Sequence, residues 1–134
     1  MAVTFAPRYP KQVQFSETAV AVLVAGLTTV ITVPVEGLEE VGFLVTNADA
    51  ADAFDAFQVQ FQYYPDGAYT AMASAGADFT TPTWPILKCS ADPTTLAAAA
   101  TSGMVVDVRG AYQMRIQASA AVNPSAATIQ GCGR

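Results

Sequence analysis

The chain contains no histidine, few charged residues and only two cysteines. Without histidine it can have neither a Ser-His-Asp nor a Cys-His catalytic arrangement, no His-ligated zinc site and no histidine pH switch. The two cysteines, Cys89 and Cys132, are too far apart in the sequence for a CxxC metal or redox motif. We expect two buried thiols, and a single disulfide that ties the terminal strand to the middle loop is the alternative.

Charged residues make up 13% of the 134 residues, against roughly 25% in typical soluble proteins. The net charge is −5, and the six basic residues are scattered along the chain: Arg8, Lys11, Lys88, Arg109, Arg115 and Arg134. Because binding to phosphates or anionic lipids needs concentrated positive charge, we expect neither direct DNA or RNA binding nor a membrane-surface role. With an apolar share of 52%, we expect partner proteins to cover part of the apolar surface, and the alternative is that many outer positions are Ala, Thr and Gln.

The longest apolar stretch, residues 18–35, has the sequence TAVAVLVAGLTTVITVPV. The apolar run is shorter than the roughly 20 residues that a membrane-spanning helix needs, and threonines interrupt its second half. Gly26 breaks the middle, and β-branched residues dominate from 28 to 35. We therefore expect a strand, a short turn and a second strand, with a signal peptide as the alternative.

Residues 57–63 alternate strictly between apolar and amide side chains. Phe57, Val59, Phe61 and Tyr63 share one side of the expected strand, and Gln58, Gln60 and Gln62 share the other side. The sequence Pro65-Asp66-Gly67 then predicts a turn. An outward face that is polar but uncharged suits contact with another protein, so we name Gln58, Gln60 and Gln62 as interface candidates.

Short patterns typical of strands recur along the chain, at 12–15, 19–24, 28–35, 41–46, 56–64, 69–74, 104–108, 112–118 and 128–132. The pattern at 41–46 is apolar on both faces and predicts a central strand that is covered on both sides. Prolines between 75 and 95 predict a loop with one edge strand near 84–89, and 94–100 predicts one helical turn. Strands at this spacing predict a single antiparallel β-sandwich over residues 12–134, jelly-roll-like and built of about eight short strands.

Residues 1–11, MAVTFAPRYPK, precede this domain and contain two prolines and two aromatic residues. We interpret them as an extended N-terminal arm. The arm is either a frayed terminus or a segment that docks on a neighbouring subunit, with Phe5 and Tyr9 as its anchors.

The acidic clusters and the aromatic residues are the other candidate sites, and their residue types give only weak support for binding. We interpret Asp49, Asp52 and Asp55 as solvated loop charges, because their spacing does not match a Ca²⁺ loop, and Glu36, Glu39 and Glu40 in the same way. Trp84 could form a sugar-binding platform with Tyr63, Tyr64 and Tyr69, but packing is the favoured interpretation. Trp84 lies in a proline-rich loop and is the best single candidate for an exposed contact. No nucleophile with a base, no metal site and no cofactor site can be named.

The order of short motifs resembles small structural proteins of tailed-phage and prophage particles. The motifs are Val45-Thr46-Asn47, then Asp55 to Val59 with Pro65-Asp66-Gly67, then Ala73-Ser74 and Asp78-Phe79-Thr80, then Leu96 to Ala99 and Val106-Asp107-Val108, and finally a Met-Arg-Ile strand. The resemblance covers roughly residues 28–132. It implies a virion protein that assembles in many copies, as capsid decoration or as a head–tail or tail component.

We therefore expect a non-enzymatic capsid decoration or stabilising subunit of a bacteriophage particle, assembled in the cytoplasm of the bacterial host. Its partners would be other copies of itself, as a homo-oligomer, and a major capsid or other virion protein. Three alternatives remain open from the sequence. They are a head–tail or tail component, a carbohydrate-binding β-sandwich module, and a hydrolase with an unrecognised carboxylate pair.

Overall fold

The structure, a computed structural model, describes residues 2–6, 12–24, 26–49, 51–71, 86–90 and 96–134. These residues form ten strands and no helix. The strands are β1 (Ala2–Ala6), β2 (Gln12–Val22), β3 (Thr28–Pro34), β4 (Glu40–Asn47), β5 (Phe54–Gln62), β6 (Thr70–Ala71), β7 (Ile86–Cys89), β8 (Thr101–Asp107), β9 (Gln113–Ala120) and β10 (Ser125–Gly133).

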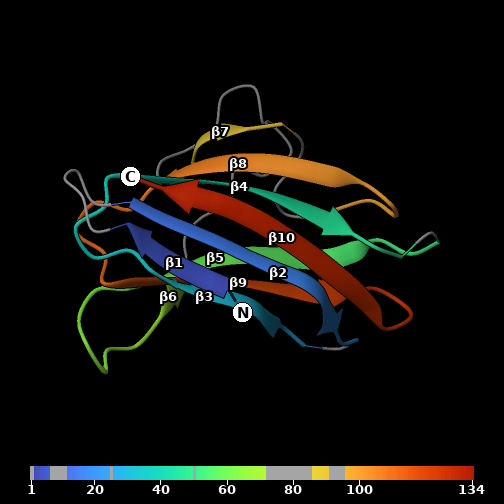
Figure 1. Cartoon of the computed structure of the whole chain (residues 1–134). Coiled ribbons are helices and arrows are strands. Elements are labelled where there is room, and N and C mark those ends of the chain that lie inside the picture. Colours follow the sequence, from blue (N-terminus) through green and yellow to red (C-terminus); the bar gives the residue numbers. More distant parts are fainter. Residues whose placement is uncertain (1, 7–11, 25, 50, 72–85, 91–95) are drawn as a thin grey trace.

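The strands form two antiparallel sheets that lie one over the other (Figure 1). One sheet has the order β1-β2-β10-β4-β8-β7 and the other has the order β3-β9-β5-β6. Without the edge strands β1 and β7, each sheet has four strands, and every connection except β5–β6 crosses from one sheet to the other. This is the arrangement of a jelly roll, so the predicted fold class is confirmed, with two more strands than expected.

The core fills the space between the sheets and consists almost entirely of apolar side chains. Alternate residues of each strand point inward, as the period of two requires. In β9, Met114 and Ile116 are fully buried, and in β5 Phe57, Val59 and Phe61 are buried on the inner face. The edge strand expected near 84–89 is confirmed as β7, which pairs with β8 at the end of its sheet.

Three local predictions are wrong. The patterns at 12–15 and 19–24 belong to one strand, β2, which continues past Ala19 at φ 53° through an irregularity in its pairing with β10. Among residues 96–100 there is no helical turn, because Leu96 pairs with the start of β5 and its carbonyl accepts a hydrogen bond from Phe54 N at 2.9 Å. β4 is central, but only one of its faces is covered, and Leu44 is 46% exposed.

The apolar stretch 18–35 forms the end of β2 and the whole of β3, as expected. The described part of the chain has no helix long and apolar enough to cross a membrane.

A buried polar cluster closes one end of the sandwich around Asn47, the last residue of β4. Asn47 Nδ2 donates to the carbonyl oxygens of Asp52 at 2.9 Å, Ala97 at 3.3 Å and Leu96 at 3.4 Å. Its Oδ1 accepts hydrogen bonds from Asp49 N at 3.0 Å and Ser125 Oγ at 2.9 Å. One side chain therefore joins β4, the loop before β5, the segment before β8 and the start of β10.

Ser102 of β8 has a buried hydroxyl without a hydrogen-bond partner. Among the described side chains, it is the one with such an unsatisfied buried polar atom. We expect Ser102→Ala to raise the free energy of unfolding by about 1 kcal/mol, since an unsatisfied hydroxyl is removed from the core. Urea unfolding followed by circular dichroism measures this. Ser125→Ala is the matched control and should lower stability by about 1 kcal/mol, because the Ser125 hydroxyl is bonded. A destabilised Ser102→Ala variant would contradict the prediction.

Candidate interaction surface

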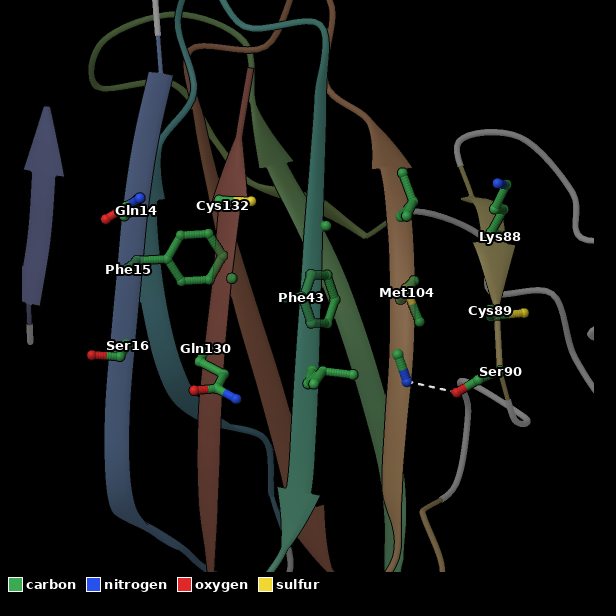
Figure 2. A pocket seen from close by; sticks show the side chains of 15 residues that line it. Gln14, Phe15, Ser16, Phe43, Lys88, Cys89, Ser90, Met104, Gln130 and Cys132 are labelled. Carbon is green, nitrogen blue, oxygen red and sulfur yellow. Dashed lines mark hydrogen bonds between the residues drawn. The ribbon is translucent and has the colours of Figure 1, made fainter. Parts of the chain in front are cut away.

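The outer face of the six-stranded sheet carries a shallow groove with a volume of about 920 Å³. Figure 2 shows the five strands that form it side by side, in the order β2, β10, β4, β8 and β7. Strand pairing brings its residues into two rows across the sheet. One row is Gln14, Cys132, Gly42, Val105 and Lys88, and the other is Ser16, Gln130, Leu44 and Gly103, with Ser90 at its end.

Glycines make this face hollow. Gly42 and Gly103 occupy outward positions of β4 and β8, where no side chain rises above the sheet. Leu44 borders Gly103 so closely that a Cβ atom on Gly103 would lie 3.0 Å from Leu44 Cδ2. Sequence reasoning did not find this groove, although a glycine inside a strand pattern was its signal at Gly42.

Charges lie mainly at one end of this face and are paired there. Arg134 contacts Glu40 at 2.8 Å, and Arg109 contacts the buried carboxylate of Asp107 at 2.7 Å. The Asp107 carboxylate, through its hydrogen bonds and its charge, raises the pKa of Arg109 above its ordinary value. Of the described residues that line the groove, only Lys88 is charged. The groove is therefore an uncharged surface of small and apolar groups with one cation at its edge.

The two cysteines both line the groove and are not joined by a disulfide. The expectation that both thiols are buried is wrong, because Cys132 is exposed and Cys89 is half-buried. Cys132 points outward from β10 between Gln14 and Gly42, whereas Cys89 is in register with Met104. Two strands, β4 and β8, lie between β10 and β7 and keep the thiols apart.

The amide row of β5 lies on the outer face of the other sheet. Gln58, Gln60 and Gln62 are opposite Gln117, Arg115 and Gln113 of β9, in register. Gln60 and Gln62 are each only 8% exposed, so little of these two side chains is open to a partner. Gln58 is half-buried. The alternation correctly gives the side of the strand, but the neighbouring strand already fills much of the space around these amides.

Hydrogen bonds within the chain use much of this amide face. Arg115 Nε donates to Gln60 Oε1 at 2.6 Å, and Gln60 Nε2 donates to Gln58 Oε1 at 3.0 Å. Gln62 Nε2 donates to the Gly67 carbonyl at 2.8 Å, which holds the turn after β5. The Arg115 guanidinium also stacks on the ring of Tyr69 at 3.9 Å. Contact of these three glutamines with another protein stays a prediction, and the groove is the more open surface.

A second apolar patch lies at one end of the sandwich, where β2 leads to β3 and β9 leads to β10. Its members are exposed large apolar side chains: Leu23, Val24, Leu27 and Val122. The two connections touch, because Val24 pairs with Ala120 and Ala120 N donates to the Leu23 carbonyl at 2.9 Å. We call these four residues the end patch.

The remaining interface candidates fall largely outside the described side chains. Phe5 lies in β1, where its backbone is in register with Val13. Tyr9 and Trp84 lie outside the described residues. Tyr64 is 64% exposed and Tyr63 is 44% exposed. The Tyr63 ring lies edge-on to Phe61, with 6.3 Å between the ring centroids. We expected packing to bury these two tyrosines, and it does not. The Arg115 guanidinium covers one face of the Tyr69 ring, and a sugar-binding platform of Trp84 with these tyrosines stays a prediction.

The acidic loop before β5 is organised by its own backbone. Hydrogen bonds from the N–H groups of Ala51 and Asp52 lower the pKa of the Asp49 carboxyl below its ordinary value. Asp52 Oδ2 accepts a hydrogen bond from Asn123 at 2.7 Å. Among the described residues, no three His, Cys, Asp or Glu side chains group as metal ligands.

Comparison with known proteins identifies a shared architecture. The SPBc2 prophage-derived protein YomS superposes with a TM-score of 0.55 and 12% identity, over 91% of this chain and 93% of that chain. This likeness shows the fold. A chain of infectious bursal disease virus Gx strain aligns at 11% identity over 99% of this chain and 43% of that chain, with a TM-score of 0.30 that is too low for an argument. No protein-family model and no curated protein sequence matches the chain.

Proposed function

We propose that the chain is a non-enzymatic structural subunit of a bacteriophage particle, and more specifically a capsid decoration or stabilising protein. It acts through repeated contacts with other copies and with the major capsid protein. The observation that carries the proposal is the groove, because it offers a wide, nearly uncharged sheet face. The jelly-roll fold occurs in viral capsid domains, and YomS, which has a similar fold, is prophage-derived.

The chemistry of the groove favours a protein partner. The lining of glycine, valine, leucine, serine and glutamine is uncharged apart from Lys88, and the face of a sheet can pack against a second layer about 10 Å away. Burial of apolar surface contributes about 25 cal/mol per Å², and a stable interface needs roughly 800 Å² per partner. Repeated over many copies, contacts of this size stabilise a shell against internal pressure.

Leu44 stands at the centre of this surface and supports a direct test. We expect Leu44→Asp to reduce the amount of chain bound to particles by about tenfold or more, because a carboxylate would be buried in an apolar contact without a partner. Particles of the phage that encodes the chain are purified from host lysates by density gradient, stripped of the chain and re-loaded with each variant. The bound fraction is read by quantitative mass spectrometry.

Leu23→Asp is the matched control, since it places the same carboxylate on a leucine of the end patch that is 55% exposed, against 46% for Leu44. Both variants must first unfold at the wild-type denaturant concentration. Binding of Leu44→Asp at the wild-type level would contradict the groove as the contact surface. If Leu23→Asp alone lost binding, the contact would lie at the end patch instead.

A further inference from the structure

The N-terminal strand β1 lies at the edge of the six-stranded sheet, against β2 (Figure 1). The pairing is antiparallel and runs from Ala2 opposite Ser16 to Ala6 opposite Gln12. On its other side, β2 pairs with β10 along most of its length, from Val13 to Val22. β1 is therefore the separable strand of this sheet edge, and β2 belongs to the jelly roll itself.

The edge of β2 is a binding site for a strand with the sequence AVTFA, and every copy of the chain carries that strand. A strand from a second copy would form the same backbone hydrogen bonds at the same edge. Exchange of an identical strand between copies costs little for this reason. The exchanged and closed arrangements differ only in the path of the segment between β1 and β2 and in the independent motion that two linked subunits lose.

The connection between β1 and β2 is residues 7–11, PRYPK. Two of its five residues are prolines, which have no backbone N–H and a fixed φ angle. Proline is compatible with a turn as well as with extended backbone, so the composition of this connection does not decide between the closed arrangement and a crossing one. An unpaired β2 edge would also be open to other strands, which gives the assembly a reason to keep it occupied.

We propose that β1 is exchanged between copies, so that residues 2–6 of one subunit pair with Gln12–Ser16 of the next. The exchange links subunits side by side along the sheet that carries the groove. It rests on the proposed function only for the high local concentration that an assembled particle supplies. The partner is a second copy of this chain, because the edge is already shown to accept this strand in register.

Thiol cross-linking tests the exchange directly, since Thr4 and Gln14 face each other across the β1–β2 pair. In a Cys89→Ser/Cys132→Ser background, Thr4→Cys and Gln14→Cys are made as two separate proteins of different mass. They are unfolded, mixed, refolded at high concentration and treated with a short bismaleimide. Exchange predicts a covalent heterodimer that increases with concentration and exceeds a control pair at least tenfold. The control replaces Gln14→Cys with Val122→Cys, which is exposed at the end patch, away from β1.

A Thr4→Cys/Gln14→Cys double variant reports the closed arrangement by cross-linking within one chain. The same pairs are also treated in purified particles. The proposal is overturned if the double variant links only within chains and the mixed pair gives no heterodimer in either setting. Cross-linking of Thr4→Cys to a different virion protein in particles would also overturn it. The cross-linking of refolded protein in solution tests the exchange even if the chain proves absent from particles. The strand exchange and the proposed role in a phage particle can therefore fail separately.

Discussion

Asn47→Ala will lower the free energy of unfolding by about 3 to 4 kcal/mol. The Asn47 side chain is fully buried, and all of its polar atoms are hydrogen-bonded. Its oxygen accepts from the Asp49 N–H and the Ser125 hydroxyl, and its nitrogen donates to backbone carbonyl oxygens. Truncation removes the hydrogen-bond partner of the Asp49 N–H, the Asp52 carbonyl oxygen and the Ser125 hydroxyl, and each group left unsatisfied inside the protein costs about 1 to 3 kcal/mol. Urea unfolding at equilibrium, followed by circular dichroism, measures the change.

Asn123→Ala is the matched control. The Asn123 amide also donates to the loop before β5, to Asp52 Oδ2 at 2.7 Å, but it does so at the surface. We expect its removal to change stability by less than about 0.5 kcal/mol. If the free energy of unfolding of Asn47→Ala were within about 1 kcal/mol of the wild-type value, the hydrogen bonds of Asn47 would not be what stabilises this end of the sandwich.

Gly131→Ala will destabilise the protein by about 3 kcal/mol, because the sheet and the core leave no space for a side chain there. A Cβ atom on Gly131 would lie 2.6 Å from Phe15 Cζ and 2.7 Å from Phe43 Cβ, and it would also overlap the Gly42 carbonyl oxygen. Backbone pairing of β10 with β4 and β2 prevents the strands from separating. Forcing extra volume into such a site typically costs 1 to 3 kcal/mol, and contact with backbone atoms puts this position at the upper end.

Gly42→Ala provides the comparison on the adjacent strand. Its Cβ would point outward into the groove and meet Val105 Cγ2 at 3.6 Å and the Met104 carbonyl oxygen at 3.9 Å, which are ordinary contacts. We expect a change within about 0.5 kcal/mol in the same unfolding experiment. Equal stability of the two alanine variants would show that the Phe15 and Phe43 rings move aside at little cost.

The sequence predicted what depends on local periodicity. Alternation over 57–63 located β5 and its buried face, and the strand pattern at 112–118 located β9. Irregular backbone defeated the same reasoning. The bulge at Ala19 made one strand look like two, and the pairing of Leu96 with Phe54 overrode the helical preference of an alanine run.

The candidate surface depends on strand order, which no local pattern contains. Gly42, Gly103 and Gln130 lie far apart in the sequence and meet because β4 lies between β10 and β8. In the same way, Gln60 is buried because it lies opposite Arg115, 55 positions away. An alternating strand shows which side chains share a face, but the neighbouring strands decide whether that face is open.

The central claim is that this jelly roll works by packing its groove against neighbouring subunits. Electron cryomicroscopy of native particles at side-chain resolution tests it most directly. We predict that the chain occupies regular positions on the particle and that Leu44, Gly42 and Gly103 face protein rather than solvent. Particles without the chain, or with the outer face of the six-stranded sheet open to solvent in every copy, would contradict the claim.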